Sequence, residues 1–295
     1  MSGALLRLPR DTAFYLFALP FALLTAVFGL WPILLAIRVS FAPSATALRA
    51  DPGWVGFANY AAVLSDPLFL DSLVRTLGYT GAAVAANLTF ALAYAMLLDS
   101  PALGRGRAFF KLAVFLPVVT PDVAGYVVWR WLYDQSFGAV NAALALLGLP
   151  AFGGLASPAT AVPAVLLAEL WHHAGFYIVV FLANLAVLDR ALTEAAMVDG
   201  AGPWARFRHV VLPQMRPSLT VNGVYALIQF LKTFTVVVVM TKGGPADATN
   251  FVSYYAYQMF DTAQYGRATA MATVLFAVVG VVALSAYAAA ARGRA

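Results

Sequence analysis

The sequence contains no cysteine, which excludes disulfide bonds, thiolate catalysis and cysteine-based metal sites. Charge is also scarce: charged residues make up 11% of the 295 residues, whereas 62% are hydrophobic. A soluble domain needs far more polar surface than this composition supplies. Little chain is left over for a soluble domain, so we expect one polytopic membrane domain covering residues 1–295.

Lysine and histidine are rare as well, and neither forms a recognisable site. The only lysines are Lys111, Lys232 and Lys242. None has the glycine-rich context in which backbone N–H groups and a lysine cradle phosphates, so ATP binding by that route is not expected. His172 and His173 are adjacent and point to different helix faces, a poor metal pair. With no hydrolytic triad, we expect no enzyme, no catalytic residue, and no metal or cofactor bound by this chain.

Six apolar stretches are long enough to cross a bilayer as helices, for which about 20 residues suffice. Backbone groups in lipid must be paired internally, so these stretches should be helical. The alternation typical of transmembrane β-strands is absent. The expected fold is therefore all-α, with six transmembrane helices. Their approximate bounds are 14–37, 73–98, 110–133, 163–187, 219–241 and 268–291.

The first stretch resembles a signal peptide, because it follows Arg7 and Arg10. Its apolar core is longer than the usual 7–15 residues of a signal peptide. Ala45 and Ala47 imitate the small residues of a cleavage site. We favour an uncleaved first span.

The distribution of lysine and arginine predicts the orientation. The positive residues concentrate at the N-terminus, in the second-to-third and fourth-to-fifth loops, and at the C-terminus; they are Arg7, Arg10, Arg105, Arg107, Lys111, Arg190, Arg206, Arg208, Arg216, Arg292 and Arg294. The positive-inside rule makes this side cytoplasmic. Both termini should therefore be cytoplasmic, as an even number of spans requires. Orientation also accounts for the net charge of +5, with no need for nucleic acid.

Residues 189–217, DRALTEAAMVDGAGPWARFRHVVLPQMRP, form a polar, basic loop between the fourth and fifth spans. Asp189 can cap a helix over Arg190–Val198. Gly200 and its neighbours then break the helix, and Pro203 suits the first turn of a second helix, Trp204–Leu212. From the residues alone, two interpretations remain: an amphipathic helix lying on anionic lipid, or a segment that couples to a cytoplasmic partner.

Three ionisable residues lie within the predicted spans: Asp122, Glu169 and Lys232. Each costs about 2.5–3.5 kcal/mol at a helix centre. At 1.5 Å per residue, all three fall about 18–20 Å from the cytoplasmic end, in one layer. They either fix packing through an ion pair or hydrogen bond between helices, or line a solute path. Other candidates for such a path, all on the fifth span, are Asn222, Tyr225 and Gln229.

Three further features bear on the fold and the solute path. Pro117 and Pro121 predict a kink in the third span, because each removes a backbone donor. The aromatic residues Tyr126, Trp129, Trp131, Tyr133 and Trp171 are typical of an interfacial belt, or else stack against a sugar. The long outer segment 38–72 either docks a solute-binding protein or caps the bundle.

Several short motifs, taken in order and spacing, resemble one known family over nearly the whole chain. The loop 189–217, which we call the docking loop, contains Glu194-Ala195-Ala196, Asp199-Gly200-Ala201 and Leu212-Pro213. The other matching motifs are Trp54-Val55-Gly56-Phe57-Ala58-Asn59-Tyr60, Asp66-Pro67, Leu116-Pro117, Trp129-Arg130-Trp131, Phe230-Leu231-Lys232-Thr233-Phe234 and Thr241-Lys242-Gly243-Gly244-Pro245. Together they resemble the permease subunits of ABC importers, in particular the carbohydrate-type branch that includes maltose and glycerol-phosphate permeases. The chain departs from the family at Asp189, usually proline, and at Asp122, usually apolar.

The resemblance implies a permease that receives a sugar or sugar-like solute from an extracytoplasmic binding protein. It implies a second permease subunit and an ATPase dimer that carries ATP and magnesium, in the cytoplasmic membrane of a bacterium or archaeon. In the family the docking loop sits in a groove of the ATPase. By analogy, the coupling residues would be Glu194, Ala195, Ala196, Asp199, Gly200, Ala201, Arg206, Leu212 and Pro213.

Two other classes of function remain as alternatives. An ion-coupled secondary transporter would work alone and use Asp122 and Glu169 as proton sites. A membrane scaffold or receptor would move no solute. ATP-dependent uptake that is insensitive to protonophore separates the importer from both.

Overall fold

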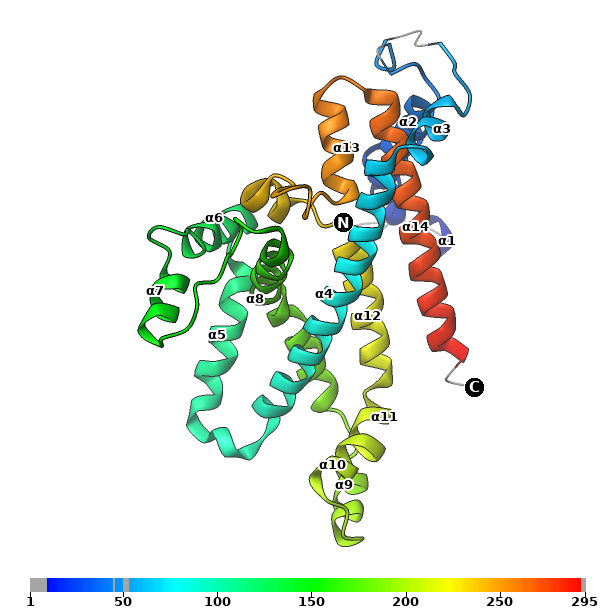
Figure 1. Ribbon diagram of the computed structural model, residues 1–295. Helices are drawn as coiled ribbons and strands as arrows, with labels where there is room; N and C mark the ends of the chain where they lie inside the picture. The colour runs from blue at the N-terminus through cyan, green and yellow to red at the C-terminus, as the bar shows by residue number, and fades with distance from the viewer. Residues whose placement is uncertain (1–9, 45, 50–52, 293–295) are drawn as a thin grey trace, which may run out of the picture. The chain divides into compact units, whose positions relative to one another are not determined.

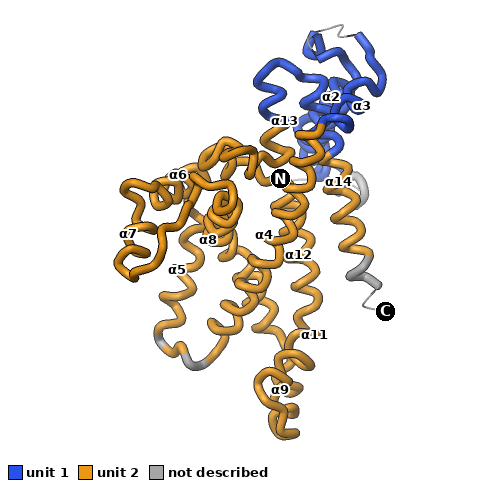
Figure 2. The backbone as a smooth tube through the Cα atoms, viewed as in Figure 1, with its two compact units in different colours: residues 1–66, 256–274 blue, residues 67–255, 275–295 orange. Residues whose placement is uncertain are grey.

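The computed structural model describes residues 10–44, 46–49 and 53–292, and within these ranges the chain is helical without a strand (Figure 1). Some residues of the orientation and cleavage arguments fall outside the described ranges: Arg7, Ala45 and Arg294, together with the side chains of Arg10, Arg105 and Arg292. The chain forms two compact units, residues 1–66 with 256–274 and residues 67–255 with 275–295 (Figure 2).

The first unit contains the first apolar span. It runs through α1 (Arg10–Leu24), a π-helical segment (Thr25–Leu30) and α2 (Trp31–Ser40). Residues Tyr15–Ser40 are long and apolar enough to cross a membrane, close to the predicted 14–37, and none of the side chains in its most apolar window is buried. A short helix, α3 (Ala58–Leu64), follows. Two helices belong partly to each unit: α13 (Val252–Asp261) and α14 (Tyr265–Arg292), the latter close to the predicted 268–291.

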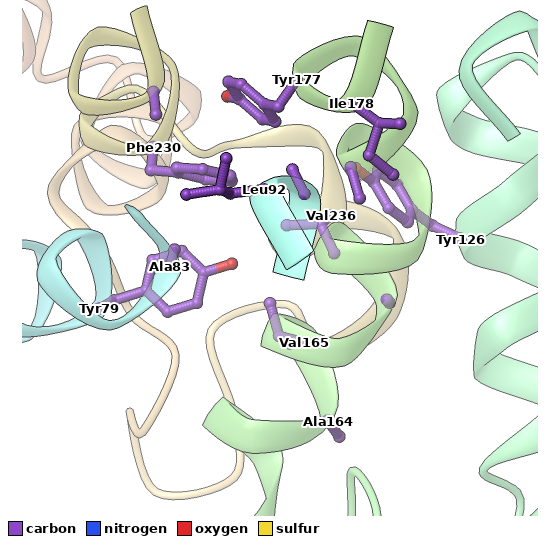
Figure 3. Packing of buried hydrophobic residues seen from close by; sticks show 14 of the residues in the cluster. Tyr79, Ala83, Leu92, Tyr126, Ala164, Val165, Tyr177, Ile178, Phe230 and Val236 are labelled. Carbon is purple, nitrogen blue, oxygen red and sulfur yellow. The ribbon is translucent and has the colours of Figure 1, made fainter. Parts of the chain in front are cut away.

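The second unit is built around α4 (Pro67–Asp99) and α8 (Pro158–Leu185), which pack together and correspond to the predicted spans 73–98 and 163–187. Many of the buried residues between helices are alanines, which let membrane helices approach closely. Larger side chains such as Tyr79, Tyr177 and Phe230 complete the core (Figure 3). This packing makes α4 and α8 the rigid frame on which the other elements are placed.

The third predicted span, 110–133, is not one kinked helix. It consists of α5 (Arg107–Val119) and α6 (Asp122–Leu132), whose axes differ by 104°. Thr120 between them is extended, with ψ 133°. The residue before a proline is pushed out of the helical region, and Pro121 is such a proline. The predicted position of the kink is confirmed, and the break between α5 and α6 is sharper than a kink within one helix.

The fifth predicted span, 219–241, is also interrupted. Helix α12 (Arg216–Leu231) ends at Lys232, and a second helical segment resumes at Thr235 and includes the π-helical turn Val237–Thr241. The described residues thus contain four helices long and apolar enough to span a membrane, or five if α5 and α6 are counted together. The described residues therefore do not confirm the expectation of six transmembrane helices.

The remaining helices are short. A 3-10 turn (Pro101–Gly106) joins α4 to α5, and α7 (Ala139–Leu146) lies between α6 and α8. The predicted docking loop contains α9 (Arg190–Val198), α10 (Pro203–Arg206), a π-helical segment (Phe207–Val211) and α11 (Leu212–Gln214). The bounds of the first loop helix match the prediction, and the second continues as one helical stretch beyond Pro203.

Candidate functional site

A polar cavity of about 190 Å³ lies where the two interrupted helices break. Asp122 begins α6 after the first break, and Lys232 caps α12 at the second. Negative charge is favoured at a helix N-terminus and positive charge at a C-terminus, each by about 0.3–1 kcal/mol. The broken helices therefore supply matching partial charges for both side chains. Glu169 of α8 and Gln229 of α12 line the same cavity.

Glu169 is held by three hydroxyl groups from three other segments. It is 4% exposed. Tyr79 of α4 donates to one carboxylate oxygen at 2.9 Å, and Thr233, in the break after α12, donates to the same oxygen at 3.4 Å. Tyr126 of α6 donates to the other at 3.2 Å. A buried carboxylate with three donors is satisfied, so Glu169 ties α4, α6, α8 and the second break together.

The other two ionisable residues do not pair with each other. Asp122 contacts His172 of α8, with 3.0 Å between Oδ1 and Nε2, and its side chain remains 56% exposed. Within the described part of the chain, no carboxylate lies within 4.0 Å of the Lys232 ammonium group. Two charged side chains thus border the cavity without neutralising one another. Such groups do not face lipid readily, since each costs about 2.5–3.5 kcal/mol at the bilayer centre.

A second cavity of about 220 Å³ adjoins the first, because Asp122, His173 and Gln229 line both. Its wall is aromatic. The rings of Phe176 and Tyr225 lie 4.8 Å apart between centroids, and Tyr225 is half-exposed. Aromatic faces beside hydroxyl, amide and carboxylate groups offer both stacking and hydrogen bonds to a small polar molecule.

The six path candidates from the sequence are therefore separated into three groups. Asp122, Glu169, Gln229 and Lys232 line the first cavity, and Tyr225 lines the second. Asn222 lines neither of them; it is buried, and its side-chain nitrogen and oxygen have no hydrogen-bond partner in the described residues.

Sequence reasoning missed His172 and His173 as cavity residues. His172 is buried and holds Asp122, and His173 lines both cavities, with its Nε2 3.5 Å from the Tyr126 hydroxyl. The available signal was their helical spacing, since His172 and His173 follow Glu169 by three and four residues, and each is therefore a neighbour of Glu169 on the helix surface. Across the described ranges, no cluster of three metal-binding side chains is present.

The aromatic residues of α6 and α8 do not form a uniform interfacial belt. Tyr126 and Tyr133 are buried, and the Tyr133 hydroxyl donates to the Ala164 carbonyl at 3.2 Å. Trp129 packs edge-on against Trp171, with 5.9 Å between ring centroids, whereas Trp131 is exposed. Trp131 and Trp171 are the exposed members of this set, so they keep the exposure that an interfacial belt residue needs.

The docking loop has the local structure that its sequence predicts. The Asp189 carboxylate accepts from the Ala191 N–H at 2.9 Å and so caps α9. Gly200 has φ +78°, a conformation that favours glycine, and no heavy atom lies within 4 Å of where a Cβ would stand. Within this chain, space around Gly200 does not explain the glycine; its positive φ does, because other residues rarely adopt that backbone conformation.

The predicted coupling residues differ in exposure. Glu194, Ala195, Asp199 and Gly200 are exposed, whereas Ala196, Ala201, Arg206, Leu212 and Pro213 are partly buried. Glu194 and Arg206 line a groove of about 580 Å³ that also includes Asp99. Asp99 itself pairs with Arg107 at 2.9 Å. The loop thus presents one face outward and keeps a mixed-charge groove behind it.

Comparison with known proteins identifies the architecture. A trehalose/maltose transport system permease protein, MalF of Thermococcus litoralis, is 30% identical over 90% of this chain and 89% of its own. An sn-glycerol-3-phosphate transport system permease protein, UgpA of Yersinia pseudotuberculosis, is 32% identical over 83% of this chain and 82% of its own. A crystal structure of a bacterial ABC transporter involved in the import of the acidic polysaccharide alginate contains a similar chain. That chain superimposes on this one with a TM-score of 0.82 and is 25% identical in sequence, over 96% of both chains.

The family model for the binding-protein-dependent transport system inner membrane component matches residues 61–294, which include both helix breaks, the polar cavity and the docking loop. The chain therefore belongs to the family of binding-protein-dependent transport system inner membrane components.

Proposed function

We propose that this chain is the transmembrane permease subunit of an ATP-driven ABC importer for a sugar or sugar-like solute. The family match over residues 61–294 carries the proposal, and the sugar permease relatives support the class of solute. A transport-system membrane component is not an enzyme, so no reaction is assigned to the chain. These sugar permease relatives give no support to the ion-coupled secondary transporter.

The proposed assembly contains a second permease subunit, an ATPase dimer with ATP and magnesium, and an extracytoplasmic solute-binding protein. The name of the family supports the binding protein, and the absence of a phosphate-binding loop from the sequence supports a separate ATPase. The chain would lie in the cytoplasmic membrane of a bacterium or archaeon as one domain, residues 1–295. Positive residues concentrated in alternate loops support cytoplasmic termini.

The polar cavity is proposed as part of the solute path. Asp122, Lys232 and Gln229 offer an acceptor, a donor and an amide with both, which is the combination that sugar hydroxyls use. Tyr225 adds an aromatic face at the adjoining cavity. Glu169 differs from these residues, because three hydroxyls already engage it, and its proposed role is to hold the helices that form the cavity.

The docking loop is proposed to couple the permease to the ATPase. Exposed Glu194 would face a basic or polar group of that partner, and exposed Ala195 would let its backbone approach. Asp199 and Gly200 form the turn that sets the direction of the second loop helix. Closure of the ATPase pair would then move the loop.

Copurification and transport test the whole proposal. The tagged chain is extracted from its native membranes in mild detergent, and its partners are identified by mass spectrometry. The complex is then placed in proteoliposomes, and the binding protein is screened for sugars by thermal shift. We expect an ATPase and a second permease to copurify, and sugar uptake to require ATP and resist a protonophore. Uphill transport by the isolated chain, or uptake driven by a proton gradient alone, would overturn the proposal.

A further inference from the structure

Four aromatic side chains cluster just after the first span, and we call them the aromatic cluster: Phe41, Trp54, Phe57 and Tyr60. Phe41 stacks on Trp54 with 4.8 Å between ring centroids and meets the Phe57 and Tyr60 rings at 5.3 Å each. The cluster is open on one side, since Trp54 is 70% exposed and Phe57 is 72% exposed. Two large aromatic residues held side by side and uncovered mark a surface that contacts something apolar.

Hydrogen bonds fix the aromatic cluster to the end of the first span. The last carbonyls of a helix lack intrahelical partners. At the end of α2 the buried Asn59 side chain donates to the Ser40 and Ala42 carbonyls, both at 2.8 Å. The Val55 N–H donates to the Phe41 carbonyl at 2.8 Å, and the Ser40 and Tyr60 hydroxyls lie 2.6 Å apart. The cluster therefore cannot leave the last turn of α2 without unpairing buried polar groups.

This attachment determines the depth of the aromatic cluster in a bilayer. The apolar stretch Tyr15–Ser40 has 26 residues. At 1.5 Å per residue it is about 39 Å long, somewhat more than the ~30 Å hydrocarbon core. Its last turn therefore emerges among the lipid headgroups. Arg38 is exposed in that turn, where a long basic side chain reaches lipid phosphates while its stem stays in apolar surroundings.

We propose that the aromatic cluster is a lipid anchor, in which Trp54 and Phe57 insert into the headgroup region of the leaflet where the first span ends. Tryptophan is enriched at this depth because most of its ring is apolar while its N–H can stay in water, and Phe57 adds apolar area beside it. The anchor sets the height and tilt of the first span. It requires that this span crosses the bilayer, but it does not depend on the solute, the ATPase or the orientation of the chain.

The natural chain has no cysteine, so a single introduced cysteine reports on one position. Ala61 is exposed and lies one helical turn after Phe57, on the same face of α3. The Ala61→Cys variant is spin-labelled in nanodiscs of phosphatidylcholine and phosphatidylglycerol, and its collisions with oxygen and with a water-soluble nickel chelate are measured. Phe28→Cys near the middle of the first span is the hydrocarbon reference, and Ser136→Cys in an exposed turn is the aqueous reference.

We expect the ratio of oxygen to nickel collisions at Ala61 to lie between the two references, severalfold above Ser136. Replacing both Trp54 and Phe57 by serine in the labelled variant should lower this ratio towards the aqueous value, while Asn59 keeps α3 in place. An aqueous value in the unmodified cluster would overturn the proposal. Shielding from oxygen and nickel alike would also overturn it, because that result means another protein covers the cluster. The measurement on Ala61 decides the matter even where the serine variant does not fold.

Discussion

The Tyr79 hydroxyl donates to the Glu169 carboxylate at 2.9 Å, joining two helices across 90 residues of sequence. Tyr126 in α6 and Thr233 in the break after α12 donate to the same carboxylate. One buried side chain thus fixes the positions of both interruptions. The integrity of the cavity should depend on Glu169 more than on any residue that merely lines it.

Replacing Tyr79 by phenylalanine should destabilise the protein by about 0.6–1.7 kcal/mol, the range for a hydrogen bond between membrane helices. The ring remains to pack against Phe251, with ring centroids 4.7 Å apart, so only the donor is lost. Thermal unfolding in detergent measures the effect. Tyr94→Phe on the same helix is the control, because that hydroxyl has no hydrogen-bond partner in the described chain. Equal effects of the two substitutions would contradict the role assigned to Tyr79.

A methyl group at Gly175 should separate α5 from α8. Its Cβ would overlap the Val114 carbonyl oxygen and lie 2.7 Å from a Val118 methyl carbon. Overpacking of this kind costs about 1–3 kcal/mol. Gly175→Ala should therefore lower the melting temperature and the yield of assembled protein. Gly78→Ala in α4, where nothing lies within 4 Å of the new Cβ, should be neutral or slightly stabilising.

Substitutions at Gly200 can distinguish backbone strain from lost contacts with a partner. Asparagine tolerates the left-handed conformation better than other residues, so Gly200→Asn should keep the fold of the loop and most of the uptake. Gly200→Val strains the backbone and adds bulk, so ATP hydrolysis should continue while sugar uptake falls. Normal uptake by the valine variant would contradict the coupling role. Gly202→Ala is the control, because its φ is −67° and its surroundings are open.

Asp122 should couple energetically to His172 rather than to Lys232. A double-mutant cycle with Asp122→Asn and His172→Gln should give an interaction energy of about 0.5–3 kcal/mol, as for residues in contact. The same cycle with Lys232→Met should give less, because no ion pair joins these two side chains. Thermal stability is the readout for both. A larger coupling to Lys232 would mean that the two charges pair in the membrane.

Removal of the Tyr225 ring should weaken solute binding more than assembly. A stacked aromatic contact contributes about 0.5–1.5 kcal/mol, so Tyr225→Ala should raise the KM of uptake roughly twofold to tenfold. Val221→Ala, one turn earlier on α12 and exposed, should leave KM unchanged because valine lines neither cavity. A lower kcat with unchanged KM would place Tyr225 outside the solute path.

Local signals predicted local structure well. Asp189 caps α9, and the break at Gly200 falls where the sequence places it. The bounds predicted for α4, α8 and α14 were also right to within six residues at each end. A run of about 20 apolar residues is long enough to cross a bilayer as a helix, so such runs are readily recognised.

The interruptions were harder to predict because their causes are tertiary. Pro121 signalled a kink after α5, but the 104° bend depends on where α6 finds its packing partners. The second break has no proline or glycine at Lys232–Phe234. There the Thr233 hydroxyl donates to the Glu169 carboxylate, a tertiary contact between residues far apart in the sequence. The sequence therefore located a kink in the third span but not the size of the bend, and it gave no sign of the break in the fifth.

The two interrupted helices have a mechanical consequence. A helix transmits an axial push only while its backbone hydrogen-bond ladder is unbroken, and the ladders of α5 and α12 stop at the polar cavity. By contrast, α4 runs 33 residues and α8 runs 28 without a break. If the docking loop is displaced as proposed, the unbroken α8 can carry that displacement along its length, whereas α6 and residues 235–241 can change their angle at the breaks only by disturbing the hydrogen bonds that Tyr126 and Thr233 donate to Glu169.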